Sequence, residues 1–246
     1  MRTPLLLVAL WGWAGPAQLE AGLERADALA SKARQAEEKE KAAAVEAALH
    51  AYRALIAKRP KDREWVPKLR RRRASLLAHA GRVREALSEY DVILKGPASR
   101  YERARALRDS GKLLSRGGDY GRAVERFERV AARYRDIGSL AADALLRAGR
   151  CREAAAQPEA AERTWRRVVD RYRSEPKAAI AAYDALALQA IERRDAKGAE
   201  RWLRRCMDRY AKRAARGDRR GVWLGRLLGE MKAPARLGEA AQKRPQ

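Results

Sequence analysis

Apolar and small side chains recur along the chain at the spacing of an α-helix. In the segment 161–172 they occupy one helical face, formed by Ala161, Trp165, Val168, Val169 and Tyr172. The preceding segment, 140–152, presents a similar face, formed by Leu140, Ala144, Leu145, Ala148 and Gly149. A turn around Gln157-Pro158 lies between the two segments. This pattern predicts two helices that pack together through their apolar faces.

The same pattern returns about every 38 residues. Segments 161–172 and 199–210 are identical at eight of their twelve positions, and both end in Arg-Tyr, as 123–134 does. A small residue opens the second segment of each unit, at Ala48, Ala86, Ala123, Ala161 and Ala199. A large residue follows four positions later, at Tyr52, Tyr90, Phe127, Trp165 and Leu203. Another small residue stands twelve positions earlier, at Ala36, Ala74, Gly111, Gly149 and Ala187. These columns predict five helix pairs, which must stack because no pair buries its apolar face alone.

Glycine and proline divide these units. Between units stand Pro60, Gly96-Pro97, Gly138 and Pro176, and within units stand Gly81, Gly117-Gly118, Pro158 and Gly198. Ala, Leu, Glu, Lys and Arg dominate the composition, whereas Val, Ile and Thr are sparse. Helices are therefore favoured over an extensive sheet.

The repeated unit resembles the tetratricopeptide repeat (TPR) family, most closely in the segment from Gly118-Asp119-Tyr120 to Val130. The resemblance covers roughly residues 20 to 213 and is strongest from 101 to 213. The family's usual period is about 34 residues. The period of about 38 residues in this chain resembles that of the TPR variant in bacterial envelope proteins, such as the Tol-Pal-associated cell-division coordinator and the outer-membrane assembly lipoprotein. The resemblance implies an all-α, right-handed solenoid of helix-turn-helix repeats that acts as a protein–protein interaction scaffold.

The first 17 residues have the pattern of a secretory signal peptide. A positive start, Met1-Arg2-Thr3-Pro4, precedes ten apolar or small residues, 5–14, and then further small residues. Cleavage is predicted after Ala17, with Ala14 as the alternative. A cytosolic N-terminal helix and an uncleaved anchor are the competing interpretations. We expect an exported protein, periplasmic or associated with the cell envelope.

Beyond that segment, residues 18–60 are predicted to form a degenerate first repeat. One long helix or coiled coil is the alternative, because no Gly or Pro interrupts 23–59. Residues 61–213 are predicted as TPR-like repeats. Residues 214–246 are predicted as a capping helix at 221–231, followed by a frayed tail from Lys232.

Few residues have the chemistry of a catalytic or metal site. His50 and His79 have no nearby Cys or carboxylate cluster in the sequence, and Cys151 and Cys206 match no zinc or haem spacing. Free, buried thiols are favoured for the cysteines, with a disulfide as the alternative. Glutamates recur with the repeat, which favours helix-surface ion pairs such as Glu162 with Arg166 and Glu200 with Arg204. We therefore expect no enzyme activity, no cofactor and no metal.

The charge balance is strongly basic. Lys and Arg number 56 against 32 Asp and Glu, a net charge of +24. Such a chain attracts polyanions in a salt-sensitive way. For an exported protein these are acidic proteins, anionic lipids or wall polymers rather than nucleic acid. The run 70–73, four arginines, lies in a predicted helix without an aromatic platform for stacked bases.

The resemblance also implies where a partner binds, because the first helices of TPR units line an inner groove. Its predicted basic residues are Lys68, Arg71, Arg72, Arg105, Arg108, Lys112, Arg116, Arg147 and Arg150. In the last unit the equivalent positions are more apolar: Ala181, Asp184, Leu188 and Ile191. The hypothesis is that arginine forks hold an acidic peptide segment there. A solvated basic surface without one ligand is the alternative interpretation.

The predicted function is therefore a non-enzymatic scaffold or adaptor of the bacterial cell envelope. Two other functions remain open. One is electrostatic binding of an anionic envelope polymer or lipid, and the other is an accessory role in an envelope enzyme complex.

Overall fold

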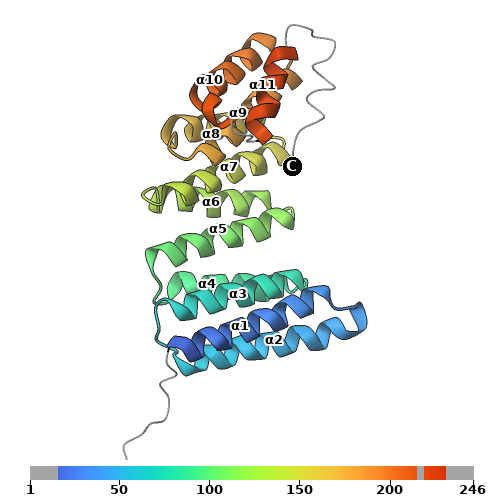
Figure 1. Cartoon of the computed structure of the whole chain (residues 1–246), viewed down its shortest axis with the longest axis vertical. Coiled ribbons are helices and arrows are strands. Elements are labelled where there is room, and N and C mark those ends of the chain that lie inside the picture. Colours follow the sequence, from blue (N-terminus) through green and yellow to red (C-terminus); the bar gives the residue numbers. More distant parts are fainter. Residues whose placement is uncertain (1–15, 215–218, 231–246) are drawn as a thin grey trace, which may run out of the picture. The chain divides into compact units, whose positions relative to one another are not determined.

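The described part of the chain consists of helices joined by short turns (Figure 1). The computed structural model describes residues 16–214 and 219–230. Its helices are α1 (Pro16–Gln35), α2 (Glu38–Lys58), α3 (Trp65–His79), α4 (Val83–Lys95), α5 (Arg100–Arg116), α6 (Tyr120–Arg133), α7 (Gly138–Ala154), α8 (Pro158–Arg171), α9 (Pro176–Glu192), α10 (Ala196–Ala214) and α11 (Arg219–Glu230). The chain divides into two compact units, one up to Leu113 and one from Leu114. The boundary falls inside α5.

The first unit is built from antiparallel helix pairs. Helix α1 packs against α2, and α3 packs against α4 and α2. The segment 18–60 forms two helices rather than one, because α1 ends at Gln35 and α2 begins at Glu38. Ala36 therefore lies in the turn between α1 and α2. The prediction that Ala36 is the small residue of the first helix in this pair is wrong. Ala26, Ala30 and Ala33 supply the small buried face instead.

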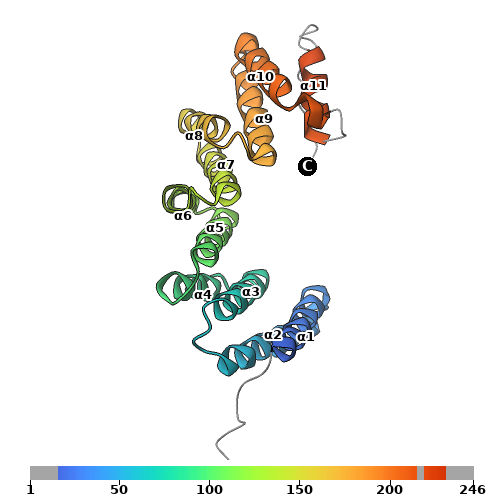
Figure 2. The ribbon, with the colours of Figure 1, turned by 60° about the vertical axis from the view of Figure 1, so that its left-hand side comes forward.

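The second unit continues the alternation from α6 to α11, in which each helix packs against the next. Helices α7 and α9 also contact each other directly. Figure 2 shows α7 and α9 on one side of this unit and α6 and α8 on the other. Helix α11 packs on α10 and α9 and buries Trp223 and Leu227 in the shared core. The first helices α7 and α9 thus form one row of this unit, and the second helices α6 and α8 form another.

The sequence columns form the contacts between the helices of each pair. The five small residues that open the second helices are completely buried, and the five large residues four positions later are at most 4% exposed. Of the first-helix small residues, Ala74, Gly111, Gly149 and Ala187 are buried. Residue size therefore determines how closely each pair packs, as predicted.

One close contact of this kind joins Gly149 of α7 to Trp165 of α8. The indole is fully buried, and its Nε1 donates a hydrogen bond to the Leu146 carbonyl at 3.2 Å. A Cβ at position 149 would lie 2.1 Å from that nitrogen and 2.5 Å from Cδ1. Glycine is required here because the ring lies directly on the α7 backbone.

The turns inside four units share one backbone conformation. Each has a residue with positive φ: Gly81 (76°), Gly118 (79°), Ala156 (56°) and Arg194 (60°). Each next residue donates its N–H to the carbonyl five positions before it: Arg82 to Leu77, Asp119 to Leu114, Gln157 to Arg152 and Asp195 to Ala190. This is the Schellman pattern that ends many helices. The sequence located two of these turn residues correctly, but Pro158 and Gly198 lie in the first turns of α8 and α10, not in the turns themselves.

An ion-pair network links three consecutive helices of the second unit. Glu128 of α6 accepts hydrogen bonds from Arg152 of α7 at 3.0 Å and from Arg167 of α8 at 2.8 Å. Burial alone would raise the pKa of Glu128, but the hydrogen bonds from Arg167 and Arg152 hold that pKa below its ordinary value. The predicted surface pairs Glu162–Arg166 and Glu200–Arg204 are also present, each at 2.5 Å.

These observations confirm the predicted fold class, an all-α assembly of TPR-like helix-turn-helix repeats. The predicted signal segment lies outside the described residues except for Pro16 and Ala17, which begin α1, and the predicted tail from Lys232 lies outside them entirely. Within 16–214 and 219–230, no helix is both long enough and apolar enough to span a bilayer.

Candidate functional site

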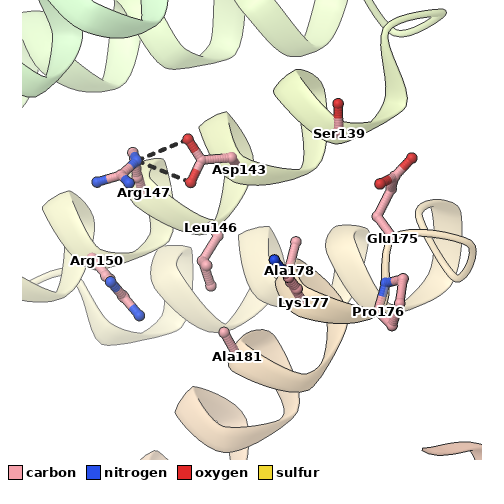
Figure 3. A pocket seen from close by; sticks show the side chains of 10 residues that line it. All are labelled: Ser139, Asp143, Leu146, Arg147, Arg150, Glu175, Pro176, Lys177, Ala178 and Ala181. Carbon is pink, nitrogen blue, oxygen red and sulfur yellow. Dashed lines mark hydrogen bonds and ion pairs between the residues drawn. The ribbon is translucent and has the colours of Figure 1, made fainter. Parts of the chain in front are cut away.

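A cleft of the second unit lies between the first helices α7 and α9 (Figure 3). Its volume is about 500 Å³. The lining residues are Ser139, Asp143, Leu146, Arg147 and Arg150 from α7, with Glu175, Pro176, Lys177, Ala178 and Ala181 from the start of α9. Two of the predicted groove residues, Arg147 and Arg150, are thus placed together in one cleft.

Small apolar side chains line the bottom of this cleft. Leu146 and Ala181 are buried, and Ala178 is partly buried against the core. Figure 3 shows Leu146 and Ala178 close together, with Arg147 and Arg150 towards one end and Glu175 towards the other. Because alanine occupies two α9 positions, α9 leaves open a space that a larger residue would fill. This apolar surface can accept one side chain of a bound segment.

Charged groups surround the apolar surface. Arg147 donates through Nε to both carboxylate oxygens of Asp143, at 3.0 and 3.1 Å. This pair is about one-third exposed on each side chain, so its own contribution to stability is small. Lys177 is exposed and has no ion-pair partner among the residues that the structure describes. The rim therefore carries two arginines and a lysine against two carboxylates.

The second carboxylate, Glu175, lies at the N-terminus of α7. A Cβ on Gly138 would come within 2.7 Å of its Oε1, so the missing side chain makes room for the carboxylate. The positive end of the α7 dipole favours a negative group in this place. Glu175 therefore has a structural role at the end of the cleft. Arg147, Arg150 and Lys177 supply the positive charges of the lining.

The predicted groove residues of the first unit have other contacts. Arg71 pairs with Glu102 at 3.3 Å and Asp109 at 3.8 Å, and Arg72 pairs with Asp27. The remaining contacts join Arg105 to Glu102, Arg108 to Asp109, Arg105 to the Tyr101 ring and Lys68 to the Trp65 ring. Much of the expected basic groove is neutralised here by carboxylates of the same unit. Lys112 also has contacts within the protein, whereas Arg116, which belongs to the second unit, is exposed.

Two other expectations change with the structure. Asp184 of α9 is completely buried rather than on the inner surface, and Leu188 and Ile191 are partly buried against the core. Asp143, Glu175 and Lys177 also line the cleft, although none of them was predicted from the sequence. Asp143 is recognisable in the sequence as an i,i+4 partner of Arg147, and Glu175 as an acidic residue at the start of a helix. Lys177 lines the cleft only because α7 and α9 lie side by side.

The two histidines and the two cysteines, the candidate residues for catalysis or metal binding, all lie in helices. His50 and His79 are exposed, and Cys151 and Cys206 are buried free thiols. Cys151 donates to the Ser115 hydroxyl at 3.3 Å, and burial raises the pKa of its thiol, which keeps it protonated and weakly nucleophilic. In the described ranges, no group of three or more His, Cys, Asp or Glu side chains is arranged to hold a metal ion.

Comparison with protein families supports the same architecture. Residues 143–174 match the tetratricopeptide repeat model. That segment includes most of α7, all of α8 and three of the charged residues of the cleft. A search of curated proteins found no match.

Three solved structures share the fold at low sequence identity. BtubC from P. vanneervenii has a TM-score of 0.59 and 16% identity, over 82% of this chain and 84% of that one. The nearly identical TPR-like repeats of a Podosopora anserina protein, provisionally assigned as a kinesin light chain, have a TM-score of 0.56 and 17% identity, over 82% and 99%. MamA has a TM-score of 0.51 and 14% identity, over 72% and 95%. Such likenesses establish a TPR-like fold.

Proposed function

We propose that this protein is a scaffold that holds an acidic segment of a partner protein in the cleft between α7 and α9. The observation that carries the proposal is the combination of an apolar surface at Leu146, Ala178 and Ala181 with Arg147, Arg150 and Lys177 around it. A segment with an apolar side chain between carboxylates matches both parts. The apolar residue loses water-exposed surface, and arginine forks donate paired hydrogen bonds to carboxylates.

The first test is binding of a synthetic peptide with one leucine between glutamates to the purified full chain. Reversal of the three cations, Arg147→Glu, Arg150→Glu and Lys177→Glu, is expected to weaken binding roughly 10- to 100-fold, since each exposed charge contact contributes up to about 1 kcal/mol. Replacing the leucine by serine in the peptide is expected to weaken binding as well. Titration by calorimetry measures each dissociation constant.

The matched control reverses Arg53, Arg163 and Lys197, which are exposed on α2, α8 and α10 and change the net charge equally. This variant is expected to bind the peptide nearly as well as the wild type. If both variants lose binding equally, attraction by net charge explains the result and the cleft does not. Circular dichroism checks that helicity is the same in all three proteins.

We also propose that the protein works outside the cytoplasm, in a bacterial cell envelope. The support is the signal-like pattern of residues 1–17. A fusion of this segment to a reporter enzyme that is active only after export tests the idea. An inactive, cytoplasmic fusion would contradict it.

A further inference from the structure

The second helices α6, α8 and α10 repeat a pair of arginines one helical turn apart. The pairs are Arg129 with Arg133, Arg167 with Arg171, and Arg205 with Arg209, in register at an offset of 38 residues. All six belong to the second unit, and none lines the cleft between α7 and α9. Like charges at this spacing repel each other and lower helix stability. The chain carries this cost three times in succession.

A buried tyrosine after each pair orients the arginines. Tyr134, Tyr172 and Tyr210 are less than 10% exposed, so each packs towards the core. The Tyr210 hydroxyl also donates to the Arg173 carbonyl at 2.9 Å. The arginine before each tyrosine, Arg133, Arg171 or Arg209, is exposed and so is directed away from the core. Five of the six arginines are exposed and Arg167 is half-buried.

Two successive hollows lie beside these arginines. The larger, of about 710 Å³, lies between the ends of α6 and α8 and is lined by Arg135, Arg167, Arg171 and Tyr172 together with Asp136 and two alanines. The next, of about 240 Å³, is lined by Arg205, Arg209, Tyr183 and Asp208. Cations outnumber carboxylates in both hollows. An anion can therefore approach several guanidinium groups at once.

Contacts within the protein account for only part of this charge. Arg133 and Arg171 lie in the last turns of their helices, where a cation stabilises the helix dipole, but Arg129 and Arg167 lie one turn earlier. Arg167 pairs with Glu128, and Arg205 stacks on the Trp202 ring at 5.2 Å. Arg129, Arg171 and Arg209 have no ion pair within the described residues. One such arginine remains on each helix.

We propose that this arginine ladder, the six residues 129, 133, 167, 171, 205 and 209, binds a linear phosphate-bearing polymer. Guanidinium forks match the oxygens of phosphate, and a ladder with a fixed repeat matches a ligand whose charges also repeat. Linked contacts add along such a chain, so a polymer binds far more tightly than one phosphate. The site goes beyond the peptide-binding function and does not depend on it.

The neighbouring surface disfavours two other anionic ligands. Among the residues of the second unit whose side-chain exposure the structure describes, Val222 of α11 is the one large hydrophobic residue that is prominently exposed. A membrane-binding surface needs apolar or aromatic side chains to enter the interface, and a site for single-stranded nucleic acid needs aromatic platforms for its bases. Tyr172 and Tyr183 border the two hollows, but both are buried, so neither offers an open ring face for a base or for a lipid interface. A phosphate chain without bases or acyl tails is therefore the ligand that the ladder fits.

The test measures binding of long-chain polyphosphate to the full chain, with tripolyphosphate and phosphatidylglycerol vesicles as the other probes. The variant carries Arg129→Gln, Arg171→Gln and Arg209→Gln, which break no ion pair of the described structure. Its affinity for polyphosphate is expected to fall roughly 5- to 20-fold, from three exposed charge contacts. The matched control, Arg53→Gln, Arg84→Gln and Arg163→Gln, removes the same charge from exposed positions elsewhere.

The proposal predicts tight, salt-sensitive binding of polyphosphate, weak binding of tripolyphosphate, and a loss confined to the ladder variant. Equal losses in both variants would overturn it in favour of non-specific attraction. Stronger binding to the vesicles than to polyphosphate at equal phosphate concentration would overturn it in favour of a membrane surface. The leucine–glutamate peptide serves as a separate readout, because the ladder variant should still bind it in the α7–α9 cleft.

Discussion

The contact between Gly149 and Trp165 leads to a quantitative prediction about the packing of the repeats. An alanine at position 149 would place its Cβ 2.1 Å from the indole Nε1 and 2.6 Å from Cε2. The ring is fully buried and held by its hydrogen bond to the Leu146 carbonyl, so it cannot rotate into solvent. Either the ring or helix α7 must move.

The expected change in unfolding free energy follows from three contributions. Overpacking of a buried site costs about 1–3 kcal/mol. Loss of the indole hydrogen bond costs about 1 kcal/mol more. The better helix propensity of alanine returns about 1 kcal/mol. We expect Gly149→Ala to destabilise the protein by about 1–3 kcal/mol.

Urea unfolding followed by circular dichroism measures this effect, with Gly121→Ala as the matched control. Gly121 lies in helix α6, and a Cβ there would meet no atom within 4 Å. The control should be neutral or slightly stabilising. The reasoning is refuted if Gly149→Ala is as stable as the control. Adding Trp165→Phe to Gly149→Ala should cost less than the sum of the two single changes, because the smaller ring relieves the clash.

Further predictions concern the turns and the ion-pair network. Gly118→Ala should destabilise the protein by about 1 kcal/mol, whereas Ala156→Gly should be neutral or stabilising, because both positions have positive φ. Thermal unfolding compares the two variants, and equal effects would contradict the positive φ at these two positions. Glu128→Gln should destabilise the protein by about 1–2 kcal/mol at neutral pH, since it removes the one carboxylate that Arg152 and Arg167 share. The pKa of Glu128 is lowered in the folded state, so its contribution is complete above the ordinary glutamate pKa, about 4.3, and is lost as the pH falls through the folded value. Urea unfolding of both proteins between pH 7 and pH 3 should show the difference shrinking with acid; a constant difference would exclude this role.

The architecture was predictable from the sequence because burial in these repeats depends on residue size. The small column at Ala161 and the large column at Trp165 are visible as residue types, and both are fully buried. The turns were only partly predictable. Gly81 and Gly118 reveal positive φ through their type, whereas Ala156 and Arg194 adopt the same conformation without any sequence signal.

The binding surface was less predictable because charge depends on neighbours from other helices. Arg71 looked like a groove residue, but Glu102 and Asp109 approach it across 31 and 38 positions of sequence. Lys177 could not be selected, since its place in the cleft depends on how α9 packs against α7. Ion pairing and helix packing therefore select which arginines of a very basic chain remain available.

The most direct test of the scaffold proposal is site-specific photo-cross-linking in native cells. A photoreactive amino acid replaces Ser139, which lines the cleft, in one strain and Lys197, exposed on α10, in another. The proposal predicts one discrete protein that is cross-linked at position 139, survives a high-salt wash and contributes an acidic peptide to the adduct. This adduct should be lost when Arg147 and Arg150 are reversed to Glu. Equal cross-linking from both positions, or an adduct at 139 that is indifferent to the arginine reversals, would contradict the proposal.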